Sequence, residues 1–177
     1  MPPPIKVELV AHSPHWATSA DAEAARLRTV LGDLLVTVHH VGSTSVPGLC
    51  AKPILDLLPV VRSVEILDER RDALERLGFR SWGEYGLAGR RYFTLDDAAG
   101  TRRVQLHCFE PNSDEIERHV AFRDYLRADP RAAREYEAEK RRCRDLHPDD
   151  SHAYSDAKSP WIERALLAAL NLARGRG

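Results

Sequence analysis

The chain has 177 residues, of which 43% are hydrophobic and 30% are charged, and its formal net charge at pH 7 is -1. These proportions are typical of a globular domain with its own core, and they exclude a fibrous repeat and a disordered segment. The near balance of positive and negative charges gives no strong signal for a nucleic-acid partner. No apolar run is long enough to span a bilayer, and the first residues lack a leader pattern. We therefore expect a cytoplasmic protein without a membrane partner.

The first third of the chain predicts one helix and two strands. Ser13-Pro14 is typical of a helix start, with the serine as N-cap and the proline in the first turn, and apolar residues follow at spacings of three and four. Residues 34–41 are rich in β-branched side chains and predict a strand that ends at Gly42. A second strand is expected at about 54–61.

The middle third predicts one further helix and three strands. Residues 63–77 carry apolar side chains at helical spacing and stop at Gly78, a typical C-terminal cap. The glycine-punctuated stretch 79–95 is typical of two short strands around a loop. Residues 96–100 then predict a hairpin connection into a strand at 103–110. The predicted order up to this point is αββαβββ.

The last third is predicted to be helical. Asn112-Ser113, Asp129-Pro130 and Ser159-Pro160 each place a capping residue where a helix is expected to begin. We therefore expect a single domain over residues 1–177, in which about 112–173 form a helical C-terminal part.

One acid, Asp56, stands inside the apolar second strand. An ionised carboxylate between Leu55 and Leu57 must reach solvent, a base or a metal, because burying it alone would cost several kcal/mol. The turn Gly42-Ser43-Thr44 directly follows the neighbouring strand, and its backbone N–H groups and two hydroxyls suit phosphate oxygens. The sequence therefore predicts a ligand site where this turn meets Asp56.

A Gly-Ser turn, a spacer of about a dozen residues and an acid on the adjoining strand resemble the nucleotidyltransferase superfamily signature. More narrowly, the segment HVGSTSVPGLCAKPILDLL and the later blocks GRRYF, QLHCF, HVAFRDYLRADPRAAREYEAEK and YSDAKSPWI resemble successive blocks of the GrpB family. The resemblance covers about residues 8 to 165. It implies an α+β, nucleotidyltransferase-like mixed β-sheet with packed helices and a C-terminal helical segment.

The superfamily resemblance also implies a role for Asp56 as a magnesium ligand. Such sites normally use two acids spaced Asp-x-Asp and a third from a later strand, but Leu58 occupies the second position here. On the later strand, His107 is the candidate site residue whose side chain is expected to face Asp56. It could act as a general base or a phosphate partner and, in third place, as a metal ligand. The structural alternative is a histidine whose hydrogen bonds are all made within the sheet. We expect Asp56 and His107 to be the catalytic pair, with a Mg²⁺ ion held partly by Asp56.

Four basic residues are candidates for phosphate binding beside Gly42, Ser43 and Thr44. The candidate bases are Lys52, Arg90, Arg91 and Lys158. Lysine supplies a point charge and arginine a bidentate clamp for phosphate oxygens. Each base also has a structural alternative, as a solvated loop, edge-strand or helix-cap residue.

These observations predict a domain that binds a nucleotide or another phosphorylated small molecule. It is expected to transfer a nucleotidyl or phosphoryl group to an acceptor as a magnesium-dependent transferase, through positioning and charge neutralisation. A non-catalytic nucleotide-binding or regulatory module with a degenerate metal site is the alternative, for which Leu58 is the main argument. A structural scaffold with an empty cleft is a third.

Overall fold

The structure, a computed structural model, describes residues 2–175. Five strands form one mixed sheet in the order β1-β2-β5-β4-β3. The elements in chain order are α1 (His15–Leu31), the short 3-10 turn η1 (Gly32–Leu34), β1 (Leu35–Val41), the 3-10 turn η2 (Ser43–Ser45), β2 (Leu55–Val61), α2 (Val64–Glu69), α3 (Arg71–Arg76), β3 (Arg80–Ser81), β4 (Arg91–Asp96), β5 (Arg102–Cys108), α4 (Asp114–Ala128), α5 (Pro130–Leu146) and α6 (Ser151–Arg174). The expected α+β architecture is confirmed.

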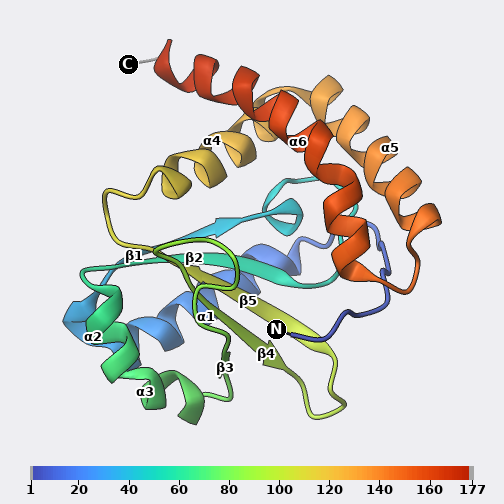
Figure 1. The fold of residues 1–177 in the computed structure, drawn as a ribbon. Coiled ribbons are helices and arrows are strands. Elements are labelled where there is room, and N and C mark those ends of the chain that lie inside the picture. Colours follow the sequence, from blue (N-terminus) through green and yellow to red (C-terminus); the bar gives the residue numbers. More distant parts are fainter. Residues whose placement is uncertain (1, 176–177) are drawn as a thin grey trace.

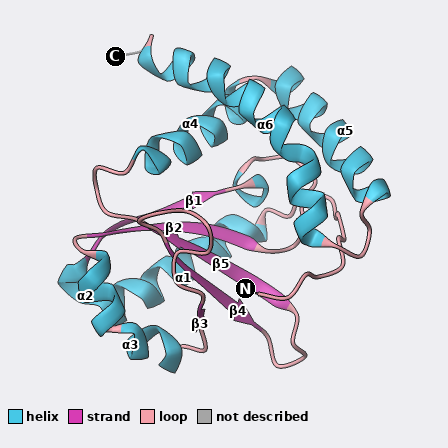
Figure 2. Cartoon of the chain, in the orientation of Figure 1, coloured by secondary structure: helices cyan, strands magenta, loops and turns pink. Residues whose placement is uncertain are grey.

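Helices cover the sheet on both faces. In Figures 1 and 2, α1, α2 and α3 lie on one side of the sheet, and α4, α5 and α6 lie on the other. Strands β2 and β5 are parallel, whereas the pairs β1–β2, β4–β5 and β3–β4 are antiparallel. No helix within residues 2–175 combines the length and the apolar character that crossing a membrane would require.

The alternation of side chains along β2 explains its internal acid. Leu55 and Leu57 point into the main core, where they pack with residues of α1, α2 and α3. Side chains two residues apart share a face of a strand, so Asp56 and Leu58 point to the opposite face, toward the C-terminal helices. Asp56 is paired in register with Gln105 on β5. The carboxylate is thus on the face that is open to a site.

Three predicted helix boundaries differ from the structure. The expected helix 63–77 is two helices, because Arg70 leaves the helical region at φ -98°, ψ 14° and separates α2 from α3. No residue at this point is a recognised helix breaker, so the sequence carries no signal for the break. The first helix begins at His15, one residue later than expected, and the side chain of Ser13 does not cap it.

The predicted helix start at Ser159-Pro160 is wrong. Helix α6 begins at Ser151, and the Asp150 carboxylate caps it by accepting hydrogen bonds from the N–H groups of His152 and Ala153 at 2.8 and 3.1 Å. Pro160 lies inside this helix. A proline has no N–H and its ring crowds the preceding turn, which bends a helix. Figure 1 shows α6 changing direction along its length.

Candidate functional site

A cavity of about 280 Å³ lies between the open face of the sheet, the η2 turn and the C-terminal helices. We call it the lysine cavity. Its lining includes Gly42, Ser43, Thr44, Lys52, Asp56, Gln105, His107, His119, Tyr136, Lys140, Tyr154 and Lys158. The turn and the acid on which the sequence prediction depended therefore line the same cavity, together with Lys52, His107 and Lys158.

Gly42 and Asp56 are in direct contact at one edge of this cavity. Gly42 has φ +68° and ψ -173°, a conformation that only glycine adopts readily. A Cβ atom at this position would lie 2.4 Å from Asp56 Oδ2 and 2.9 Å from Asp56 Cβ. The glycine is therefore required both by the turn and by the close approach of the carboxylate.

The Asp56 carboxylate is ionised and partly shielded. Its side chain is 29% exposed, and Oδ1 lies 3.5 Å from His107 Nε2. Burial alone would raise the pKa of Asp56, but the contact with His107 and the positive charges of Lys52 and Lys158 outweigh burial and lower it. The carboxylate is thus a fixed negative charge among positive neighbours.

Both ring nitrogens of His107 are engaged. Arg90 Nη1 lies 3.4 Å from His107 Nδ1, and a guanidinium can only donate, so Nδ1 accepts and the ring proton is on Nε2, facing Asp56. The chain Arg90–His107–Asp56 positions the carboxylate. In this arrangement neither ring nitrogen is free to take a proton from a substrate.

Three lysine side chains reach the lysine cavity from separate elements. Lys52 precedes β2, Lys140 is on α5 and Lys158 is on α6. Lys52 and Lys158 place Nζ 5.5 and 4.7 Å from the centre of the Tyr154 ring. Lys140 is only 1% exposed and donates from Nζ to the Cys50 carbonyl.

These lysines lose protons more easily than ordinary lysines do. Burial, reinforced by the charge of Lys158, lowers the pKa of Lys52 to about 8 and that of Lys140 to about 7. Burial also lowers the pKa of Lys158, against the attraction of Asp56. A nearby anion would favour the charged forms and reverse these shifts.

The hydroxyls of the η2 turn do not all point into the cavity. Thr44 Oγ1 lies 2.9 Å from His40 Nε2, and Ser45 Oγ donates to the Gly42 carbonyl at 2.6 Å. Burial lowers the pKa of His40 to about 4, so its ring is neutral at pH 7. Ser43 is the turn hydroxyl best placed to meet a ligand, since it is partly exposed and lines the cavity.

A second cavity of about 300 Å³ adjoins the first, and we call it the tyrosine cavity. The two cavities share Lys52, Gln105, His107 and Ser155 in their linings.

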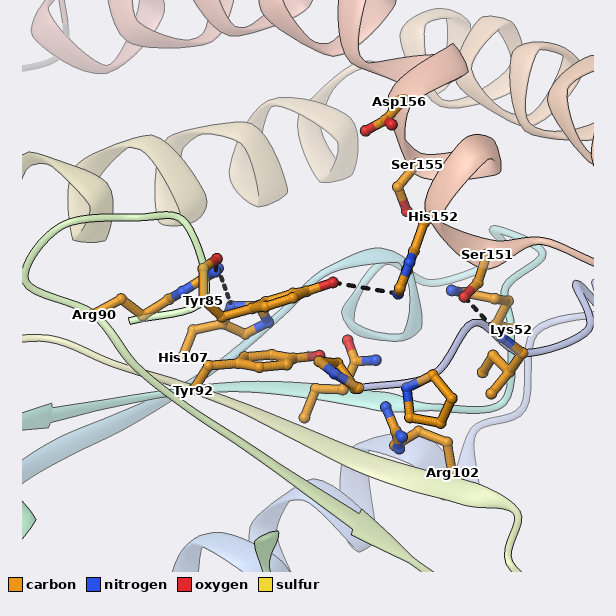
Figure 3. A pocket seen from close by; sticks show the side chains of 14 residues that line it. Lys52, Tyr85, Arg90, Tyr92, Arg102, His107, Ser151, His152, Ser155 and Asp156 are labelled. Atoms are coloured by element: carbon orange, nitrogen blue, oxygen red, sulfur yellow. Dashed lines mark hydrogen bonds between the residues drawn. The ribbon is translucent and has the colours of Figure 1, made fainter. Parts of the chain in front are cut away.

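Two stacked tyrosines form one side of the tyrosine cavity. The rings of Tyr85 and Tyr92 are 4.9 Å apart at 18°. Figure 3 shows the Tyr85 hydroxyl directed at His152 on α6, with Nε2 at 3.3 Å. Arg90 lies beside both rings, 5.5 and 5.0 Å from their centres. Tyr85 has φ +45°, and Arg90 holds this conformation by donating to the Tyr85 carbonyl.

Arg91 is the predicted phosphate-binding residue that the structure does not bring to either cavity. Its guanidinium donates from Nε to both Asp68 oxygens at 2.8 and 2.9 Å and lies 3.7 Å from Glu84. Arg91 is the first residue of β4 and points to the face opposite that of its neighbour Tyr92, which is paired with His107, whereas Arg90 precedes the strand and reaches His107. We therefore leave Arg91 out of the proposed ligand set.

The donor atoms around Asp56 do not fit a magnesium ion. Mg²⁺ requires an octahedral set of oxygen ligands, usually from one or more carboxylates together with phosphates and waters. Leu58 is fully buried in a separate cluster with Phe109, and Glu110 accepts a hydrogen bond from Val64 N at the start of α2. Within residues 2–175 no three His, Cys, Asp or Glu side chains are grouped to hold a metal.

Sequence reasoning missed Lys140, Tyr85 and His152. Lys140 belongs to a helix whose side chains are mostly charged, but the buried positions of α5 recur every three or four residues and Lys140 falls on that stripe between Tyr136 and Cys143. This spacing was a usable signal. Tyr85 and His152 carried none, because a glycine-rich loop and a helix start meet only in the folded chain.

Comparison with known proteins identifies the chain. A family model described as GrpB protein matches residues 6–167. The UPF0157 protein YqkA of Bacillus subtilis is 40% identical over 174 residues, which cover 98% of this chain and 50% of YqkA, so the chain spans half the length of that relative. The crystal structure of GrpB from Enterococcus faecalis superposes with a TM-score of 0.87 at 36% identity, covering 94% of this chain and 99% of that chain.

A more distant likeness concerns the fold alone. A structure of the Cid1 poly(U) polymerase bound to MgATP matches with a TM-score of 0.52 at 17% identity, covering 74% of this chain and 45% of that chain. The architecture is thus nucleotidyltransferase-like. Because the GrpB family model matches residues 6–167, the chain belongs to the GrpB protein family.

Proposed function

We propose that this protein binds a phosphorylated small molecule, with a nucleotide as the best-fitting class, in the lysine cavity. The observation that carries the proposal is the placement of lysine. The sequence contains four lysines among 26 basic residues, and three of the four, Lys52, Lys140 and Lys158, line this one cavity. Buried ammonium groups are costly unless an anion compensates them, and phosphate oxygens are their common partner.

The two contiguous cavities suit a ligand with two chemically different ends. A cavity of some 300 Å³ is the lower limit for a small-molecule site, and the lysine and tyrosine cavities extend each other through shared residues. The tyrosine cavity offers aromatic rings, hydroxyls and the Arg90 guanidinium to the part of the ligand that is not phosphate. The distant neighbour Cid1 is described as bound to MgATP, which supports a nucleotide as the first class to test.

Transfer of a nucleotidyl or phosphoryl group is the second candidate. The observation that favours it is the contact between Asp56 and the Gly42 turn, which places a carboxylate beside the proposed phosphate position. In its magnesium-dependent form, Asp56 would be the single protein carboxylate available to the ion, and both His107 nitrogens are already engaged. We therefore rank binding without turnover above transfer.

A thermal-shift screen tests the proposal. Nucleoside mono-, di- and triphosphates, sugar phosphates and inorganic pyrophosphate would be compared with the matching unphosphorylated nucleosides and sugars. A ligand present at one hundred times its dissociation constant adds about 2.7 kcal/mol of stability. For a chain of this size that corresponds to roughly 5–10 °C in melting temperature.

Two variants separate specific binding from nonspecific attraction. Lys158→Met removes an ammonium group from the cavity and should abolish most of the shift. Lys6→Met removes the same group from the exposed lysine and should leave the shift intact. Shifts that the unphosphorylated compounds reproduce, or that survive Lys158→Met, would refute the proposed site. Incubation of a stabilising nucleotide with the protein, followed by chromatography for cleaved products, would then separate binding from transfer.

A further inference from the structure

The charges that line the lysine cavity are unbalanced. Three lysine side chains, Lys52, Lys140 and Lys158, face one carboxylate, that of Asp56, among the described lining residues, and an entering anion favours their charged ammonium forms. The other contacts of the ammonium groups are neutral: the Tyr154 ring for Lys52 and Lys158, and the Cys50 carbonyl for Lys140. Aromatic faces and carbonyls stabilise a cation without cancelling its charge. The cavity therefore presents net positive charge to whatever enters it.

The single carboxylate also already has a hydrogen-bonding neighbour. Asp56 Oδ1 faces His107 Nε2 at 3.5 Å, and His107 is in turn held by Arg90. The position two residues along the strand, where a second metal-binding acid would stand, is Leu58, which is 0% exposed and packed with Val41, Val60 and Phe109. That position is closed to solvent as well as apolar.

A divalent cation would have to enter a site whose charges oppose it. Among the described lining side chains it would find one carboxylate, that of Asp56, and otherwise only neutral oxygen donors such as the Gln105 amide and hydroxyls, and it would lie in the same cavity as three lysines. Like charges in a partly buried site repel strongly, because the medium screens them less than water does. In enzymes that use magnesium, the ion neutralises the phosphate charge; here the lysines already supply positive charge at that place.

We infer that the lysine cavity binds the metal-free form of a phosphate or polyphosphate group with at least two negative charges, and that the lysine ammonium groups replace divalent cations in neutralising it. The inference rests on the proposed function and specifies the ionic form of the ligand. Magnesium acts against binding, because it competes with the lysines for the same phosphate oxygens. Asp56 then limits the net positive charge of the empty cavity and keeps the Gly42 turn in place, without holding a metal.

Isothermal titration with ATP and with inorganic pyrophosphate tests this inference. One buffer contains EDTA, and the other contains enough MgCl₂ to complex the ligand, with ionic strength matched by NaCl. We expect the affinity to be at least fivefold higher in EDTA. Affinity that is equal or higher with magnesium overturns the inference while leaving phosphate binding intact. Absence of binding in both buffers overturns the proposed function as well, so the two failures are distinguishable.

Variants supply a second readout that does not depend on the metal. Lys158→Met and Lys52→Met should each weaken binding in EDTA at least tenfold, whereas Lys6→Met should leave it unchanged. Asp56→Asn removes the one carboxylate among the described residues that line the lysine cavity and should tighten binding at least twofold, whereas loss of binding in Asp56→Asn overturns the inference. Circular dichroism spectra confirm that each variant is folded; if Asp56→Asn fails to fold, the two buffers and the lysine variants still decide the question.

Discussion

Replacing Gly42 with alanine tests the geometry that joins the turn to Asp56. The new Cβ would lie 2.4 Å from Asp56 Oδ2, 2.9 Å from its Cβ and 3.0 Å from its Cγ. The Asp56 Oδ2 atom could swing away, but its Cβ is fixed to the strand. Backbone strain at φ +68° costs roughly 1–3 kcal/mol, and overpacking adds roughly 1–3 kcal/mol. We therefore expect Gly42→Ala to lower the free energy of unfolding by about 2–6 kcal/mol.

Urea unfolding followed by circular dichroism measures this loss, and Gly48→Ala is the matched control. Gly48 also has a positive φ, +80°, but no atom lies within 4 Å of a Cβ built there. The control variant thus has the backbone strain without the collision. Gly42→Ala should also be less damaging in an Asp56→Ala background, where two of the three clashing atoms are gone. If Gly42→Ala and Gly48→Ala destabilise equally, the close approach of Gly42 and Asp56 is refuted.

Three further predictions concern stability. Burial lowers the pKa of Lys140 to about 7 in the folded protein, whereas the same side chain in the unfolded chain loses its proton only at about pH 10. The wild type should therefore gain stability relative to Lys140→Met as the pH rises from 6 to 9. Urea titrations in which this stability difference is the same at every pH would contradict the burial of the ammonium group. Leu58→Asp should destabilise the fold by roughly 3 kcal/mol or more, because the new carboxylate would be buried without a partner. A fully stable variant that binds magnesium would contradict the burial of position 58. Asp129→Ala should lower the free energy of unfolding by about 1 kcal/mol, because it removes the side-chain cap of α5. Ser113→Ala is the control, at a helix start without a side-chain cap, and should lower it by only a few tenths of a kcal/mol. Equal urea midpoints for the two variants would contradict the capping contacts.

The strands and their order along the chain could be predicted because the responsible interactions are local. β-Branched runs and glycine-punctuated turns placed β1, β2 and β5 to within about two residues, and alternation along β2 put Asp56 on the face opposite Leu55 and Leu57. The helix boundaries were less predictable. Ser159-Pro160 has the composition of a helix start, but α6 already begins at Ser151, capped by Asp150, and Pro160 lies inside the helix.

The candidate site could be predicted in part. Gly42, Asp56 and His107 come from adjoining strands, whose neighbours follow from the sheet, and Lys52 lies just before one of them. Lys140 and His152 reach the cavities only because α5 and α6 fold back over the sheet, and that contact depends on the tertiary structure. Arg91 shows the reverse: its residue type suited phosphate, but its place on β4 directs it to Asp68.

A crystal structure of the protein soaked with tungstate, a phosphate analogue with strong anomalous scattering, tests most directly whether the lysine cavity is an anion site. The account predicts an anomalous peak within hydrogen-bonding distance of Lys158 Nζ and close to Ser43, and loss of that peak in Lys158→Met. Peaks confined to surface arginines, with none among Lys52, Lys140 and Lys158, would contradict it.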